Sequence, residues 1–336
     1  MEDIINNHQG ETFLITGGTG FIGQAIVREL IRINKSNAHN PNKIIIVARN
    51  SGKLKEVYRD VIKDNNIISY IFANNEKLVI KEKIDWIICA AAATKKQFFA
   101  DYPADTLINN IAGIYHCLEL AKEKVVKGLV FVSSVQVYGR VKDQTIVETS
   151  FGELDCMIDE AVYPESKRMG EALVKAYCKQ YGVPAKCARL FHVYGEGETY
   201  DNGTFLSDFI NDIINGRNII IQGTGKEIRN LCYITDVVRG ILLVLYKGNA
   251  GEAYNIASEK NNFSIKDIAK MLLHVSKKMG KQVDIILKNK QNVNSSIIYR
   301  QVPNIERIIG LGWEEENPDL IKNFESLLKE ALNNKR

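Results

Sequence analysis

Residues 16–23 read Thr-Gly-Gly-Thr-Gly-Phe-Ile-Gly, and this stretch decides the fold class of the chain. The apolar residues 13–15 precede it, and a stretch with helical spacing of apolar side chains follows. A strand therefore runs into a glycine turn that opens a helix. Gly17, Gly20 and Gly23 permit the tight turn, the approach of a pyrophosphate to the backbone, and close packing of the helix on its strand. The helix amino terminus adds N–H donors and a partial positive charge, so we expect a dinucleotide-binding site.

The composition is typical of a globular enzyme. The chain has 336 residues, 45% of them hydrophobic, which is enough for one large domain or two smaller ones. Its formal charge of +4 is small, and no long block of like charge occurs, so we expect no nucleic-acid partner. The sequence has neither a leader pattern nor an apolar run of membrane-spanning length, so we expect a cytoplasmic protein with no membrane partner. The six cysteines are scattered without metal-ligand spacing, which predicts reduced thiols and no metal site.

Apolar runs and helix-like stretches alternate after the glycine turn. The apolar runs are residues 44–47, 67–72, 84–93 and 128–132, and the helix-like stretches are residues 52–63, 105–124 and 164–181. Continuous apolar runs of this kind are typical of strands that are buried on both faces. The alternation predicts an α/β fold with a Rossmann-like, doubly wound parallel sheet. The run at 84–93 ends in small residues, including Ala90, Ala91 and Ala92, which leave room for a ligand at the edge where such sheets bind nucleotides.

The residue after the second strand reads the adenosine ribose in this architecture. The chain has Arg49 there, with no carboxylate beside it. A carboxylate would repel a 2′-phosphate, whereas a guanidinium would pair with it. Arg49 therefore favours NADP, and NAD is the alternative. An exposed arginine with no role in ligand binding is the other interpretation of the same residue.

A second pattern carries chemistry. Ser134 lies at the end of an apolar run, and Tyr163 and Lys167 are four residues apart in a helix-like stretch. On a helix the two side chains share one face. An ammonium beside a phenol favours the ionised phenol and can also hold the nicotinamide ribose. The tyrosine then exchanges a proton with a sugar hydroxyl while hydride moves to or from the nicotinamide, and Ser134 fixes the same oxygen.

Taken together, these motifs resemble the extended short-chain dehydrogenase/reductase family, which contains the nucleotide-sugar epimerases and dehydratases. The likeness covers nearly the whole chain. It rests on residues 16–23, 85–93, 110, 113, 133–139, 163–167, 189–195, 223–236, 253–256 and 311–313.

The resemblance implies the roles of individual residues. It implies Ser134, Tyr163 and Lys167 as the catalytic triad. Contacts to the cofactor would come from Gly17, Gly20, Phe21, Ile22, Arg49, Ala90, Ala91, Ala92, Asn110, Tyr163 and Lys167. Arg229 stands where the family places an arginine on the sugar's diphosphate, and Arg300 is a second candidate, for which a surface salt bridge is the alternative.

The resemblance also implies the domain organisation. A Rossmann domain would comprise residues 1–192 and take back residues 232–257, and a smaller lobe for the nucleotide sugar would comprise residues 193–231 and 258–336. A homodimer would pair the helices near 105–124 and 164–181, whose apolar positions could equally belong to an ordinary core.

Departures from the family pattern bear on the reaction. Family members that eliminate water across C5 and C6 carry an Asp-Glu pair after the serine, and decarboxylating members place a glutamate at the second of these positions. This chain has Val135 and Gln136 there, and neither can exchange a proton. Gln136 is therefore a candidate substrate contact, as Ser134 is. His192 replaces the usual asparagine and could hydrogen-bond the substrate or titrate near neutral pH.

Three hypotheses remain open. The first is hydride transfer at C4 of a nucleoside-diphosphate sugar, by a 4-epimerase or by a 4-keto reductase, toward which Arg49 and the missing acid/base pair lean slightly. The second is a 4,6-dehydratase or a UDP-glucuronate decarboxylase-like enzyme with its acid/base group elsewhere, such as Glu165 or His192. The third is a non-catalytic relative that senses NADP or binds RNA, against which the intact triad argues. The sequence identifies neither the nucleobase nor the sugar, nor whether the net reaction is redox-neutral.

Overall fold

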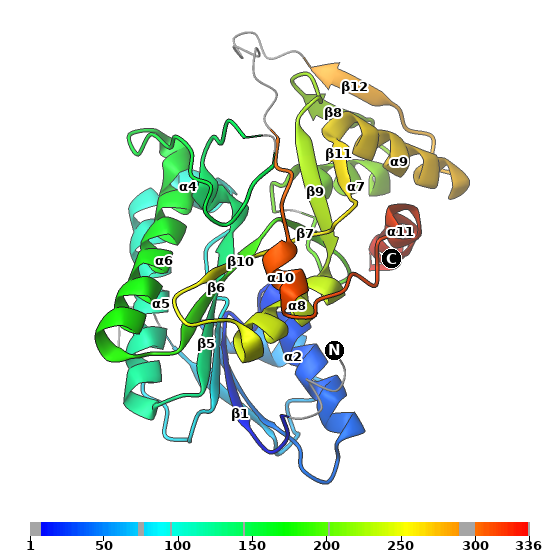
Figure 1. Ribbon diagram of the computed structural model, residues 1–336. Coiled ribbons are helices and arrows are strands. Elements are labelled where there is room, and N and C mark those ends of the chain that lie inside the picture. The colour runs from blue at the N-terminus through cyan, green and yellow to red at the C-terminus, as the bar shows by residue number, and fades with distance from the viewer. Residues whose placement is uncertain are drawn as a thin grey trace.

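The computed structural model describes residues 8–72, 77–94, 96–143, 145–200, 202–288 and 300–334. Its centre is a seven-stranded parallel sheet in the order β10-β6-β5-β4-β1-β2-β3 (Figure 1). The strands are β1 (Thr12–Thr16), β2 (Lys43–Ala48), β3 (Ile67–Ile71), β4 (Trp86–Cys89), β5 (Gly128–Ser134), β6 (Ala185–Leu190) and β10 (Ala253–Ile256). Strand order reverses at β1, between β2 and β4, and a doubly wound sheet binds its ligand at such a point. The predicted fold class is confirmed.

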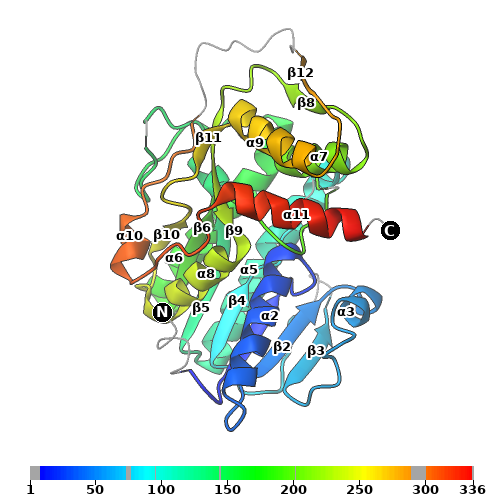
Figure 2. The ribbon, with the colours of Figure 1, turned by 90° about the vertical axis from the view of Figure 1, so that its right-hand side faces the viewer.

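Helices cover both faces of this sheet (Figures 1 and 2). The helices α5 (Pro103–Lys124) and α6 (Val162–Tyr181) pack together on one face, and α2 (Phe21–Ser36) and α8 (Ile234–Lys247) lie on the other. Strand β1 shows why its sequence is apolar throughout. Phe13 and Ile15 point into one buried cluster, whereas Leu14 points into the second cluster on the opposite face.

The chain leaves the main sheet after β6 and forms a smaller lobe at its carboxyl edge (Figure 1). This lobe contains a three-stranded sheet in the order β11-β9-β7 and a parallel pair, β12-β8. Its strands are β7 (His192–Tyr194), β8 (Ile219–Gln222), β9 (Ile228–Tyr233), β11 (Asn262–Ser264) and β12 (Ile285–Lys288), and its helices are α7 (Phe205–Ile214), α9 (Ile265–Lys278) and α11 (Leu320–Asn334). The short helix α10 (Glu306–Gly310) packs against β10. Strand β10 returns the chain to the edge of the main sheet, beside β6.

One predicted helix is shorter than expected. The sequence predicts a helix over residues 52–63, but α3 (Ser51–Val57) ends at Tyr58, and turns follow. Tyr58 is fully buried, and its hydroxyl donates a hydrogen bond to the carbonyl oxygen of Gly18 in the glycine turn. The helix ends where this tertiary contact holds the chain. Among the helices of the described residues, none is both long and apolar enough to cross a membrane.

Candidate active site

The glycine turn brings the end of β1 against the end of β4. Gly17 has a φ of +69°, and a Cβ added there would lie 2.7 Å from the backbone nitrogen of Ala91. A Cβ on Gly23 would lie 2.2 Å from the carbonyl oxygen of Gly17. Both positions therefore require glycine, because any side chain would push the turn away from the strand or from the helix. Gly20 is the N-cap of α2 and contributes no side-chain cap to that end of the helix.

The predicted contacts with the cofactor pyrophosphate lie on this turn. Phe21 and Ile22 are the first two residues of α2, and both are half-buried. Their backbone N–H groups belong to the first turn of the helix, which has no intrahelical acceptors. A helix amino terminus of this kind suits a phosphate. The sequence did not reveal the role of Tyr58, whose hydroxyl donates a hydrogen bond to the carbonyl oxygen of Gly18 and so holds the glycine turn in place.

Small residues line the crevice beyond β4. Ala90, Ala91 and Ala92 are each half-buried, and the Ala91 backbone N–H donates to Thr16 Oγ1 at 3.3 Å. Asn110 lies beside them, 6% exposed, on α5.

Asn110 links the segment after β4 to the first turns of α6. Its Oδ1 accepts a hydrogen bond from the backbone N–H of Ala93 at 2.9 Å, and its Nδ2 donates to Ser166 Oγ at 3.0 Å. Ser166 in turn donates to the carbonyl oxygen of Tyr163 at 2.7 Å. The side chain therefore shapes the crevice and fixes the start of α6, in addition to any direct contact with a cofactor.

Arg49 is exposed directly after β2. Strands β1 and β2 pair in register with Thr16 opposite Val47, so Arg49 lies at the same edge of the sheet as the glycine turn. Asn50 follows and caps α3 by accepting from the Lys53 N–H at 2.9 Å. This is the side of the crevice at which the ribose of a bound dinucleotide is read.

The three candidate catalytic residues meet at the end of β5. Ser134 is the last residue of β5, and Tyr163 and Lys167 lie on the first turns of α6. The hydroxyls of Ser134 and Tyr163 are hydrogen-bonded, and this bond lowers the pKa of the phenol. Burial has the larger effect and raises the pKa of Tyr163 to about 12. Phe99 on α4 (Lys96–Asp101) stacks on the tyrosine ring, with 5.2 Å between centroids and 17° between planes.

The sequence predicts that the Lys167 ammonium lies beside the Tyr163 phenol, but the nearest acceptor of the ammonium is a backbone carbonyl. Lys167 Nζ donates to the carbonyl oxygen of Val132 at 2.7 Å and lies 5.7 Å from the centroid of the Tyr163 ring. Burial lowers the pKa of Lys167 to about 8. Desolvation therefore outweighs the expected stabilisation of an ionised phenol, and the Tyr163 hydroxyl is protonated at neutral pH.

The two residues after Ser134 point in different directions. They open the short 3-10 helix η1 (Val135–Tyr138), which the Ser134 hydroxyl caps by accepting from the Gln136 N–H at 3.2 Å. Val135 is 7% exposed and belongs to the hydrophobic core. Gln136 is exposed, so of the two side chains only this amide is available to a ligand.

Three of the candidate substrate contacts, His192, Arg229 and Arg300, lie beyond β6. His192 begins β7, opposite Leu231 of β9, and its ring packs against Phe205 with 4.7 Å between centroids. Arg229 lies two residues before Leu231 and donates from Nη1 to the carbonyl oxygen of Ile228 at 3.0 Å. An isolated parallel bridge pairs Ile228 with Arg300, so Arg300 lies beside the start of β9, which carries Arg229.

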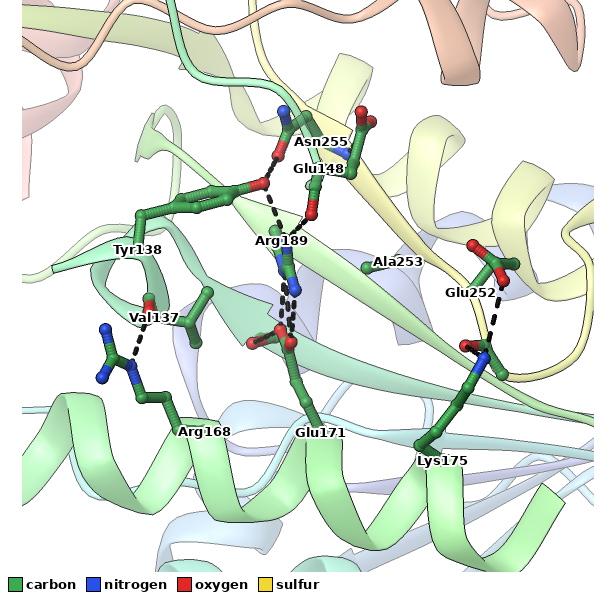
Figure 3. A network of polar contacts seen from close by, with 12 residues as sticks. Val137, Tyr138, Glu148, Arg168, Glu171, Lys175, Arg189, Glu252, Ala253 and Asn255 are labelled. Carbon is green, nitrogen blue, oxygen red and sulfur yellow. Dashed lines mark hydrogen bonds and ion pairs between the residues drawn. The ribbon is translucent and has the colours of Figure 1, made fainter. Parts of the chain in front are cut away.

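Sequence reasoning missed a polar network behind the triad (Figure 3). Arg189 on β6 contacts Glu171 on α6, and its Nη1 donates to the Tyr138 hydroxyl at 2.9 Å. Tyr138 donates to Asn255 Oδ1 at 2.5 Å, and Glu148 Oε1 accepts from the Asn255 N–H at 2.9 Å. The motif at residues 189–195 was the available signal, because it places an arginine next to the carboxyl end of β6.

The residues present fit a nicotinamide dinucleotide. Glycines and alanines line the crevice, and larger residues at these positions would fill it with their side chains. The crevice faces the amino terminus of α2, which has no side-chain cap. The candidate triad stands one strand further along the same carboxyl edge of the sheet. Within the described parts of the chain, no group of three or more His, Cys, Asp or Glu side chains is placed to hold a metal ion.

Comparisons with known proteins agree with this geometry. A sequence profile of the NAD dependent epimerase/dehydratase family matches residues 13–257. A dTDP-D-glucose 4,6-dehydratase of Dictyostelium discoideum is 30% identical over 285 residues, which cover 79% of this chain and 62% of the relative. UDP-glucuronic acid decarboxylase 6 of Arabidopsis thaliana is 27% identical over 90% of this chain and 83% of its own length. The fold matches the crystal structure of UDP-glucose 4-epimerase from Thermotoga maritima with a TM-score of 0.81 and 22% identity, over 97% of this chain and all of that one.

Proposed function

Because the chain belongs to the NAD dependent epimerase/dehydratase family, we propose that it transfers hydride at C4 of a nucleoside-diphosphate sugar, as a 4-keto reductase or a 4-epimerase. One observation carries the choice of reaction. After Ser134 the chain has a valine buried in the core and an exposed glutamine, so no acid/base pair stands beside the triad for elimination or decarboxylation. Exchange of hydride at one carbon, and of one proton at the oxygen on that carbon, requires only the triad and the nicotinamide.

The side chains have distinct tasks in this reaction. The bound nicotinamide supplies or accepts the hydride. In the reduction, Tyr163, neutral because burial raises its pKa to about 12, donates the proton to the oxygen on C4 as hydride arrives at that carbon. In the oxidation that begins an epimerase cycle, the phenolate of Tyr163 would take this proton from the C4 hydroxyl as hydride leaves. Ser134 hydrogen-bonds the same oxygen and sets its distance from the phenol. The carbonyl oxygen of Val132 holds the Lys167 ammonium at the end of β5. From there the ammonium would donate hydrogen bonds to the ribose hydroxyls and stabilise the negative charge that develops on Tyr163.

The relatives favour a second candidate, a 4,6-dehydratase or a decarboxylase. In this reaction the same oxidation at C4 comes first, and a further acid/base group must then act on the sugar. Glu165 and His192 are the candidates for that group, but Glu165 lies 3.7 Å from Arg168 and His192 packs on Phe205. Both side chains would have to leave these neighbours, and this disfavours the second candidate.

The proposal for the cofactor is NADP, with NAD as the alternative. Arg49 supports it, because this residue is exposed at the edge of the sheet where the ribose is read. The test is to denature the purified protein, identify any nucleotide that it releases, and titrate the emptied protein with NADH and NADPH. Retained NAD would indicate a 4-epimerase that recycles its cofactor. A preference for NADPH of about tenfold, or 1.4 kcal/mol, would favour a 4-keto reductase.

The substrate and the assembly belong to the same proposal. Arg229 and Arg300 would bind the diphosphate, with Gln136 and His192 on the sugar, between a Rossmann domain (1–192 and 232–257) and a lobe formed by 193–231 and 258–336. The helices α5 and α6 would pair two copies in a homodimer, because they expose the apolar side chains Ile108 (64%), Tyr115 (43%), Met169 (49%) and Tyr181 (44%). We place the protein in the cytoplasm.

A further inference from the structure

Arg189 on β6 and Glu171 on α6 form an ion pair close to the candidate triad. Arg189 donates from Nε to both carboxylate oxygens of Glu171, at 2.9 and 3.2 Å, and from Nη2 to Oε2 at 2.6 Å. Each side chain is only 14% exposed. A pair with this multiple hydrogen bonding and burial has a fixed geometry, because leaving either charge alone in such a place is costly.

Glu171 and Arg189 together hold both ends of segment 133–138 (Figure 3 shows the end at Tyr138). Ser133 donates to Glu171 Oε1 at 2.6 Å, and Ser133 is the residue before Ser134. At the other end, Arg189 donates to the Tyr138 hydroxyl at 2.9 Å. The serine hydroxyl and the Gln136 side chain are therefore carried on a short segment whose two ends are tied to the same ion pair.

Glu171 also lies one helical turn after Lys167, on the same helix. The titratable groups that face the lysine are the thiols of Cys89 on β4 and Cys187 on β6, the Tyr163 ring and the Glu171 carboxylate. Burial lowers the pKa of Lys167 to about 8, and Glu171 acts in the opposite direction. Without that carboxylate the lysine would lose its proton at a lower pH.

We propose that Glu171, clamped by Arg189, is a positioning residue for the hydride-transfer reaction: it fixes the strand end that carries Ser134 and keeps a negative charge one turn from Lys167. The inference deepens the proposed function and rests on it. It links two parts of the triad that come from different elements, β5 and α6, through one carboxylate.

The test compares Glu171→Gln with the control Glu252→Gln. Glu252 belongs to the same network, but its ion-pair partners are Lys175 at 3.6 Å and Arg307 at 3.1 Å. For each variant the dissociation constant of NADPH or NADH is measured between pH 6 and pH 10, and kcat and KM are measured on the nucleotide sugar that the enzyme turns over.

We expect nucleotide binding by the parent protein to weaken near pH 8 as Lys167 loses its proton. In Glu171→Gln this midpoint moves down by about half a pH unit or more, and kcat falls about tenfold with a smaller change in KM. Glu252→Gln keeps the parent midpoint and kcat. A Glu171→Gln protein with the parent midpoint and kcat would overturn the inference.

A second variant separates positioning from folding. Replacing both charges, in Glu171→Met with Arg189→Met, exchanges a buried ion pair for apolar side chains, a change that is often neutral for stability. We expect the parent melting temperature with a lowered midpoint for nucleotide binding, whereas an unchanged midpoint in the folded double variant would refute the inference. If the parent protein turns over no nucleotide sugar, the proposed function fails, and the pH midpoint of nucleotide binding still decides the role of Glu171.

Discussion

The ammonium of Lys167 donates a hydrogen bond to the carbonyl oxygen of Val132, 2.7 Å away, and so fastens α6 to β5 at the candidate catalytic centre. Val132 lies two residues before Ser134, and Lys167 lies one turn after Tyr163. The distance between the serine and the tyrosine hydroxyls is thus set by a bond between their own two elements. This arrangement buries the Lys167 ammonium, which lowers the pKa of the lysine and destabilises the folded protein at neutral pH.

Tyr163→Phe should remove catalysis without removing nucleotide binding. The phenol is neutral and its side chain is half-buried, so phenylalanine fits the same space beside Phe99. We expect turnover to fall by about 10²–10⁴-fold, the usual contribution of a general acid. Titration with NADPH or NADH should give a dissociation constant close to that of the parent. Full turnover by this variant would exclude Tyr163 as the proton donor.

Lys167→Met should stabilise the protein at neutral pH. The folded-state pKa of Lys167 is lowered from 10.5 to about 8, so the unfolded chain binds this proton more tightly, and the fold carries the full penalty below pH 8. The difference of about 2.5 between 10.5 and 8 corresponds to on the order of 3 kcal/mol, and loss of the bond to Val132 offsets about 1 kcal/mol of it.

Urea unfolding at several pH values checks this expectation. The parent protein gains stability as the pH rises from 8 to 10.5, because over this range the unfolded chain still binds the proton that the folded protein has lost. The advantage of Lys167→Met should therefore be largest at pH 7 and disappear by about pH 10.5. An advantage that stays constant with pH would contradict the assigned ionisation of Lys167.

Gly17→Ala should impair the nucleotide site more than the fold. The residue has a φ of +69°, and its new Cβ would meet the Ala91 backbone at 2.7 Å. Gly182→Ala is the matched control, because Gly182 has a φ of +68° with no heavy atom within 4 Å of an added Cβ. Both variants carry the left-handed backbone cost of roughly 1–2 kcal/mol. Only Gly17→Ala should weaken NADPH or NADH binding, by about tenfold or more, in fluorescence titrations.

Arg49→Asp should reverse the choice of cofactor. A carboxylate at the end of β2 repels a 2′-phosphate and accepts from the ribose hydroxyls. We expect the ratio of NADPH to NADH affinity to fall by about tenfold or more. Lys55→Asp makes the same change of charge on an exposed position of α3 and should leave the ratio unaltered. An unchanged ratio in Arg49→Asp would mean that the arginine does not read the ribose.

Ile108→Glu combined with Met169→Glu should dissociate the proposed homodimer. These side chains are 64% and 49% exposed on α5 and α6. A charge in a buried apolar interface is strongly unfavourable. Light scattering after size exclusion should give a dimer for the parent and a monomer for the double variant. Ile71→Glu, 53% exposed on β3, should remain dimeric; dissociation of this control would remove the case for α5 and α6.

The sequence was sufficient where local pattern and tertiary structure agree. The glycines at 17, 20 and 23 predicted the tight turn between β1 and α2. The spacing of Tyr163 and Lys167 predicted that both side chains lie on the same face of a helix. The order of apolar runs predicted the main sheet, because strands buried on both faces leave a continuous apolar signature.

What the sequence did not show depends on contacts between distant segments. Tyr58 reads as part of a helix, and its bond to Gly18 crosses 40 residues. The pKa of Tyr163 depends on how completely the phenol is desolvated, and the position of Lys167 depends on which acceptor lies nearest, here the Val132 carbonyl. Glu171 reads as one more polar residue of an amphipathic helix until Arg189 and Ser133 are placed beside it.

The most direct test of the proposed reaction is to follow hydrogen at C4. The protein is incubated with NADPH carrying deuterium at the transferable position and with a panel of 4-keto nucleotide sugars, and products are analysed by mass spectrometry and NMR; unlabelled nucleotide sugars are tested in parallel. We expect deuterium at C4 of a reduced sugar, or interconversion of C4 epimers with no net change in cofactor, and loss of both activities in Tyr163→Phe. Release of water or of carbon dioxide from the sugar, with neither of those products, would contradict hydride transfer at C4 as the overall reaction.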